Sequence, residues 1–149
     1  MSRLRSRIDK IRDRFHRENP ATPSHTLSAA EPPVPENRPL NSEERTLIEW
    51  LLANGTPVSA AYLEQLECLH VVSHCGCGCP TVDLAVGDAQ ASTTGASQIL
   101  ADFGGITPDG IQVGVILHAR QGKISELEVY SEEGRTSRLL PIITTLKRY

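Results

Sequence analysis

Residues 111–130, IQVGVILHARQGKISELEVY, decide the fold of this chain. Apolar residues stand at every second position over 111–120, and they alternate with glutamates over 124–130. Because successive side chains of a strand point to opposite faces of a sheet, this alternation predicts two strands, each with one apolar face. Residues 121–123, Gln-Gly-Lys, are typical of a turn. The stretch therefore predicts an antiparallel hairpin.

The period of two continues upstream of this hairpin. It predicts strands over 69–75 and 81–86, whereas the Gly-, Ser- and Thr-rich residues 87–98 (GDAQASTTGASQ) predict a loop. Pro108-Asp109-Gly110 predicts a tight turn just before the hairpin.

Two helices are predicted before the strands. Asn41 and Glu44 match the N-cap and N3 positions of a capping box, and Gly55 and Pro57 end the helix that they begin. Its apolar stripe consists of Leu47, Ile48, Leu51 and Leu52. A second short helix is predicted after Ser59. The sequence thus predicts an α+β domain over 40–149, in which an N-terminal helical hairpin precedes an antiparallel β-meander.

The first 39 residues differ in character from the rest. Residues 1–18 place Leu4, Ile8, Ile11 and Phe15 on one side of a helix and carry seven Lys/Arg against three acids, a charge of +4. They predict a basic amphipathic helix, which is either solvated or engaged with a partner protein or an anionic membrane surface. The proline-rich residues 19–39 predict a disordered linker.

The composition and charge of the chain limit the classes of function that we expect. The chain has 149 residues with a net charge of -3, and residues 19–149 hold eight Lys/Arg against fifteen acids, a charge of -7. An acidic body does not favour nucleic-acid binding. Without an apolar run of about 18 residues or a signal-peptide pattern, the sequence predicts a soluble cytoplasmic protein, whose four cysteines stay reduced.

The run Cys75-Gly76-Cys77-Gly78-Cys79-Pro80 is the strongest chemical signal. Three thiolates could hold zinc, which takes four nitrogen or sulfur ligands in a structural site, and the fourth ligand would come from His74, Cys68, His70 or His118. Against this, alternate side chains of an extended strand sit ~6.6 Å apart, too far for one ion unless the glycines bend the chain.

Two other interpretations of this run stay open. The cysteines could be small buried residues in a tight turn, or they could form a redox-active or nucleophilic thiol group. His118 and Arg120 share a strand face that Glu126 and Glu128 are expected to face across the hairpin. Such cross-strand charge pairs most often stabilise a sheet by ~0.2–1 kcal/mol and do no chemistry.

The stretches VVSHCGCGCPTVDLAV (71–86), GVILHARQGKISELEVYSEEG (114–134) and LLP (139–141) resemble a family of small bacterial proteins. The resemblance covers residues 40–141 and is most specific over Cys75–Leu84 and Leu127–Tyr130. It implies a single folded unit, and it implies no activity, because none is assigned to that family. His74 departs from the basic residue or glycine expected before the first cysteine, so it is an additional ligand candidate of this chain.

The sequence contains no phosphate-binding loop, Ser/His/Asp spacing or HExxH motif. We therefore expect a small non-catalytic binding module that engages a protein partner through residues 1–18, with zinc as its only expected cofactor. A metal- or thiol-dependent enzyme using Cys75, Cys77 and Cys79 is the first alternative. An immunity-like inhibitor, whose acidic body binds a basic protein, is the second.

Overall fold

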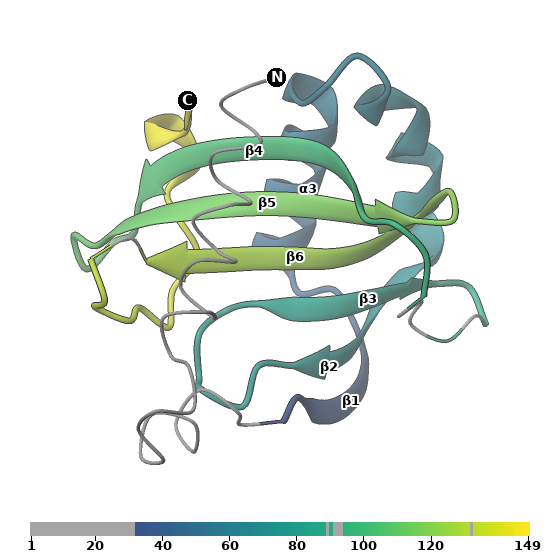
Figure 1. Ribbon diagram of the computed structural model, residues 1–149, viewed down its shortest axis with the longest axis horizontal. Coiled ribbons are helices and arrows are strands. Elements are labelled where there is room, and N and C mark those ends of the chain that lie inside the picture. Colours follow the sequence, from purple (N-terminus) through teal and green to yellow (C-terminus); the bar gives the residue numbers. More distant parts are fainter. Residues whose placement is uncertain (1–31, 89, 91–93, 132) are drawn as a thin grey trace. The chain divides into compact units, whose positions relative to one another are not determined.

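The computed structural model describes residues 32–88, 90, 94–131 and 133–149. The helix predicted over 1–18 and most of the predicted linker lie outside these residues. Residues Pro33–Arg148 form one compact unit, in which helices pack against an antiparallel sheet (Figure 1). The α+β class predicted from the sequence is confirmed.

The described part of the chain contains seven strands in the order β1-β2-β3-β6-β5-β4-β7. The strands are β1 (Val34–Pro39), β2 (Leu69–His74), β3 (Val82–Val86), β4 (Gln98–Ile106), β5 (Gln112–Arg120), β6 (Lys123–Ser131) and β7 (Lys147–Arg148). The helices are α3 (Ser42–Asn54) and the 3-10 helices η1 (Ser59–Cys68) and η2 (Ile143–Thr145).

The predicted hairpin is present as β5 and β6, which pair antiparallel. The sheet is not a single meander, however. β1, β2 and β3 follow one another, as do β4, β5 and β6, and the two groups join where β3 pairs with β6. The segment predicted as a second helix is the 3-10 helix η1, so the predicted helical hairpin is not formed by two α-helices. A 3-10 helix rises ~2.0 Å per residue against ~1.5 Å in an α-helix, which lets these residues reach farther toward β2.

Three strands were not predicted: β1, β4 and the two-residue β7. β4 includes Gly104 and Gly105, which weaken a strand pattern. The C-terminal segment packs closely over Gly105, where a Cβ would lie 2.8 Å from Leu146 Cδ2 and 3.2 Å from Pro141 Cβ. β1 lies within the stretch 19–39 predicted as a linker, so residues 34–39 belong to the sheet and the folded unit begins before Leu40. Its prolines are tolerated because β1 is an edge strand that pairs only with β2.

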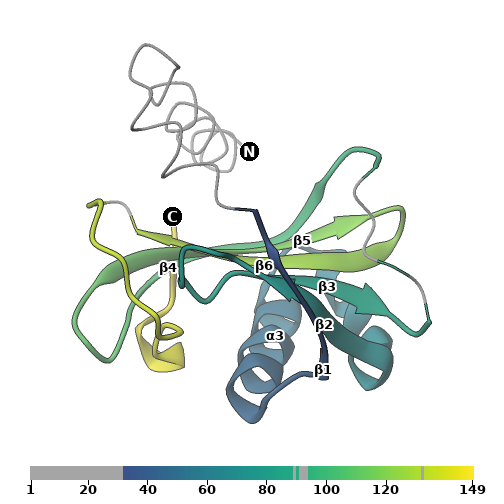
Figure 2. The same cartoon turned by 90° about the horizontal axis from the view of Figure 1, so that it is seen from below.

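The core lies between α3 and one face of the sheet. The capping box of Asn41 and Glu44 is present, and the predicted stripe of α3 is fully buried. Figure 2 shows α3 and η1 on the same side of the sheet. From the sheet, the apolar alternate residues of the strands complete this core, including Val71, Leu84, Leu100, Val115, Leu117 and Leu127. Trp50 packs edge-on against Phe103 at a centroid distance of 5.0 Å.

The opposite face of the sheet carries ionisable side chains. Asp83 on β3, Glu126 on β6 and His118 on β5 stand in direct cross-strand register. Alternation along the strands therefore places an apolar core on one face and a titratable row on the other.

Among the described residues, no helix combines the length and apolarity needed to cross a membrane.

Candidate functional site

The three neighbouring cysteines lie in a tight connection between β2 and β3. Cys75 N–H donates to Thr81 O (3.0 Å), and Gly78 N–H donates back to Cys75 O (3.3 Å), which closes a turn. Gly78 has a φ of +89°, a conformation that side-chain-bearing residues rarely adopt. The turn brings the three sulfur atoms within 4.8 Å of one another. The separation expected for an extended strand is thus abolished by the glycine-dependent bend.

The surroundings of two of these thiols, Cys75 and Cys77, shift their pKa values in opposite directions. Cys75 Sγ and Cys77 Sγ are 2.9 Å apart, and Cys79 N–H donates to Cys77 Sγ (3.4 Å). Burial raises the pKa of Cys75 to about 12, and its hydrogen bond to Cys77 adds to the rise. Burial opposes ionisation of Cys77 as well, but the hydrogen bonds from Cys75 and from the Cys79 backbone lower its pKa. Of these two thiols, the exposed Cys77 is therefore the one that ionises more readily.

The other predicted ligands are dispersed. Cys68 precedes β2 at the end opposite the loop, and His70 lies near that same end of β2, paired with Ala85 and Pro39. His118 belongs to a separate cluster on β5. Among the described residues, the group of mutually close potential ligands at the loop consists of Cys75, Cys77 and Cys79.

His74 is the predicted ligand that stays beside the loop. Its Nδ1 lies 3.1 Å from Glu36 Oε2 on β1. His74 and Cys79 line the same cavity of about 270 Å³, together with Arg38 and Arg138. A ligand histidine commonly has its second ring nitrogen bonded to a carboxylate, as His74 Nδ1 is here. Glu36 could not be foreseen, because β1 was expected to be linker.

A second cluster lies on the sheet face opposite α3. His118 Nε2 is 2.9 Å from Glu128 Oε1, and His118 Nδ1 is 2.8 Å from Ser97 Oγ. Glu126 completes the cluster, with its carboxylate within 4.8 Å of the other two ligand atoms. His118 faces the two glutamates, as predicted from the hairpin. Ser97 was placed in a loop, and nothing in its sequence context signals this contact.

The hydroxyl, imidazole and carboxylate of this cluster form a chain like that of a nucleophile, a base and an orienting acid. Glu126, however, stands directly opposite Asp83, so two acids are adjacent on the sheet. Burial raises the pKa of Glu126 to about 7; His118 and Arg120 oppose this rise, whereas Glu128 and Asp83 add to it.

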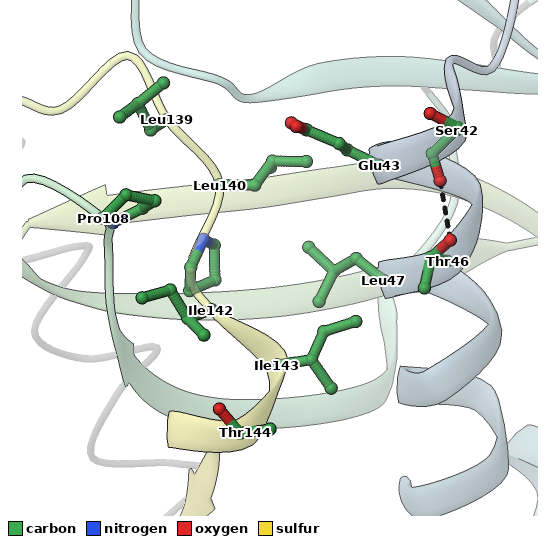
Figure 3. Close-up of a pocket in the computed structure, with 11 residues that line it drawn as sticks. Ser42, Glu43, Thr46, Leu47, Pro108, Leu139, Leu140, Ile142, Ile143 and Thr144 are labelled. Atoms are coloured by element: carbon green, nitrogen blue, oxygen red, sulfur yellow. Dashed lines mark hydrogen bonds between the residues drawn. The ribbon is translucent and has the colours of Figure 1, made fainter.

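An apolar groove of about 450 Å³ separates the first turns of α3 from the C-terminal segment (Figure 3). Leu47 points toward Leu140 and Ile143 across it. On the rim, Leu139 and Ile142 are more than two-fifths exposed. The groove offers apolar contact area and no cluster of metal-ligating side chains, so the candidate chemistry lies at the cysteine loop and at His118.

Comparison of the chain with protein-family models, with curated proteins and with solved structures gave no match. The site is therefore interpreted from its own geometry.

Proposed function

We propose that this chain is a small non-catalytic binding module whose Cys75–Cys79 loop holds one zinc ion. The observation that carries the proposal is the mutual approach of three sulfur atoms within 4.8 Å in a turn closed by main-chain hydrogen bonds. Thiolates are the preferred ligands of structural zinc.

The sulfur spacing is close to what a shared ion requires. Zinc–sulfur bonds of ~2.3 Å in a tetrahedron hold the sulfur atoms roughly 3.8 Å apart. Cys75 and Cys77, at 2.9 Å, would move apart by roughly 1 Å when their thiol protons leave. The two glycines of the loop make such an adjustment inexpensive.

His74 is the fourth ligand in this proposal. Its Nδ1 is engaged with Glu36, which leaves Nε2 as the ring nitrogen for the ion, and it shares a cavity with Cys79. The interaction with Glu36 would then orient the imidazole, as carboxylates do for zinc-bound histidines.

The test is the zinc content of untagged protein purified without chelator, measured by mass spectrometry together with a thiol titration. We expect one zinc per chain and three thiols that react only after chelation. Cys77→Ser should lose the metal, His74→Gln should weaken its binding at least ten-fold, and the matched controls Cys68→Ser and His70→Gln should retain it. Metal-free protein with freely reacting thiols would contradict the proposal.

The protein partner expected for residues 1–18 is part of the same proposal. Its support is the contrast between a +4 segment with an apolar stripe and a -7 remainder. In the full chain, Ile8→Asp/Ile11→Asp should abolish capture of a partner that Ser2→Asp/Ser6→Asp leaves intact. Equal capture by both variants would count against a partner-binding helix.

A second candidate function is thiol redox chemistry, favoured by the short Cys75–Cys77 contact and the opposite pKa shifts. Attack of the Cys77 thiolate on an external disulfide, followed by attack of Cys75, would form a Cys75–Cys77 disulfide and release two thiols. Equilibration with oxidised glutathione decides between the functions. A loss of two hydrogens from metal-free protein that Cys79→Ser preserves supports redox chemistry, and zinc-protected thiols exclude it.

A further inference from the structure

The second cluster, on the sheet face opposite α3, has a different chemistry from the cysteine loop. It offers one imidazole and two carboxylates, and it has no sulfur. Mixed nitrogen and oxygen ligands select divalent first-row ions such as Mn²⁺, Fe²⁺ or Zn²⁺. We propose that His118, Glu126 and Glu128 bind one such ion, at a site separate from the cysteine loop.

The spacing of the ligand atoms fits an ion. Two neighbouring ligands at ~2.1 Å from an octahedral ion lie roughly 3 Å apart. His118 Nε2 and Glu128 Oε1 are already 2.9 Å apart, so an ion can replace the proton between them with little movement. Three protein ligands leave coordination positions open for water or a bound molecule.

The orientation of the imidazole is fixed from outside the cluster. Ser97 Oγ lies 2.8 Å from His118 Nδ1, and it can accept a hydrogen bond from that nitrogen. When Nε2 binds an ion, Nδ1 carries the remaining ring proton, and Ser97 Oγ is in place to accept it. The arrangement is therefore that of a ligand histidine with its second nitrogen held.

The distribution of negative charge distinguishes a metal site from a nucleophile triad. A triad would use Glu128 alone, whereas Glu126 lies in direct register with Asp83 on the neighbouring strand. Like charges directly opposite each other destabilise a sheet. A divalent cation would offset this accumulation of carboxylates.

The test is a Mn²⁺ titration of the full metal-free chain, followed by electron paramagnetic resonance of the free ion. Mn²⁺ is the suitable probe because it prefers oxygen and nitrogen over thiolate ligands. We expect saturable binding of one ion that Cys75→Ser/Cys77→Ser/Cys79→Ser leaves unchanged. Glu126→Gln and His118→Gln should each weaken it at least ten-fold, and the exposed-site control Glu64→Gln should not.

Melting temperatures, measured with and without Mn²⁺, distinguish the loss of a ligand from the misfolding of a variant. Metal-free Glu126→Gln should melt at or above the wild-type temperature, because one of two adjacent acids is neutralised. Saturating Mn²⁺ should raise the melting temperature of the wild type and not that of the variant. The absence of saturable Mn²⁺ binding by the wild type, or unaltered binding by Glu126→Gln, would overturn the proposal.

Discussion

At the scale of single residues, burial and hydrogen bonding give two cysteines of the loop different pKa values. Burial and the contact with Cys77 raise the pKa of Cys75, whereas the contact with Cys75 and the Cys79 N–H lower the pKa of Cys77. The consequence is selective reactivity, because the thiolate is the nucleophilic form.

Removal of the donor should reverse this selectivity. In metal-free protein, we expect Cys77 to be alkylated faster than Cys75. In Cys75→Ala, the midpoint of the Cys77 rate profile should move to higher pH, since the S–H group that lowers the pKa of Cys77 is gone. Peptide mapping after timed alkylation measures this, with Cys68→Ser as the control. A midpoint that stays at the same pH would show that the backbone N–H alone controls Cys77.

Asp109 supplies a second prediction at this scale. Hydrogen bonds from Thr107 and then from Ser137 hold the pKa of Asp109 below its ordinary value of 3.8. A lowered carboxyl pKa stabilises the fold above the unfolded-state value, and this contribution is lost as the pH falls through the folded-state value. The stability difference between wild type and Asp109→Asn should therefore be present at neutral pH and shrink in acid. Denaturant unfolding across this pH range measures it, and a constant difference would contradict the assignment.

At the scale of elements, the N-terminus of α3 is bonded to the edge strand β1, although the sequence predicted the residues of β1 to be part of a linker. Glu44 closes the capping box with Asn41 and also accepts two hydrogen bonds from Arg38 of β1, at 2.8 and 2.9 Å. Glu44 is buried although it is charged, and Arg38 is the partner that makes this burial tolerable. The edge strand and the helix are thereby stabilised together.

The cap itself should contribute a modest and separable amount. Asn41→Ala removes the acceptor for Glu44 N–H and should lower the free energy of unfolding by ~1 kcal/mol. Asn54→Ala, at the other end of α3, is the matched control, because it leaves the capping box intact. Equal losses in the two variants, measured by urea unfolding, would mean that the capping box adds nothing beyond a generic Asn deletion.

At the scale of the whole molecule, close backbone approaches set how α3 is joined to the sheet. Thr56 N–H donates to Leu100 O of β4 (2.8 Å), and a Cβ on Gly55 would lie 2.2 Å from that same oxygen. Backbone atoms cannot move aside as a flexible side chain can, so the helix end and β4 are held at a distance that only glycine allows.

Gly55→Ala should therefore disturb the packing of the entire unit. We expect a loss of ~3 kcal/mol or more in the free energy of unfolding. Gly122→Ala, in the β5–β6 turn, meets no atom within 4 Å and should cost only the ~1–2 kcal/mol of a left-handed backbone. Thermal and denaturant unfolding of both variants measures the contrast. A smaller loss for Gly55→Ala than for Gly122→Ala would contradict this account of the helix–sheet junction.

Local sequence patterns correctly predicted the elements whose residues are chosen mainly by their own secondary structure and little by distant packing partners. The β5–β6 hairpin and the capped helix α3 have strong periodicity and clear end signals, and both are present. β4 and β1 were missed because glycines and prolines weaken strand patterns. Gly105 is accounted for by the packing of Leu146 and the prolines of β1 by its edge position, and neither neighbour is visible in a local window.

By itself, the sequence determined the α+β class, the apolar and charged faces of the hairpin, and the identity of the cysteine loop, because these depend on residues close together in the chain. Only the tertiary structure decided which groups meet. The bend at Gly78 brought the three sulfurs together, the β3–β6 pairing set Asp83 beside Glu126, and the approach of Ser97 fixed His118. The physical reason is that ligand geometry and desolvation depend on distances of a few ångström between residues far apart in sequence, which no periodicity encodes.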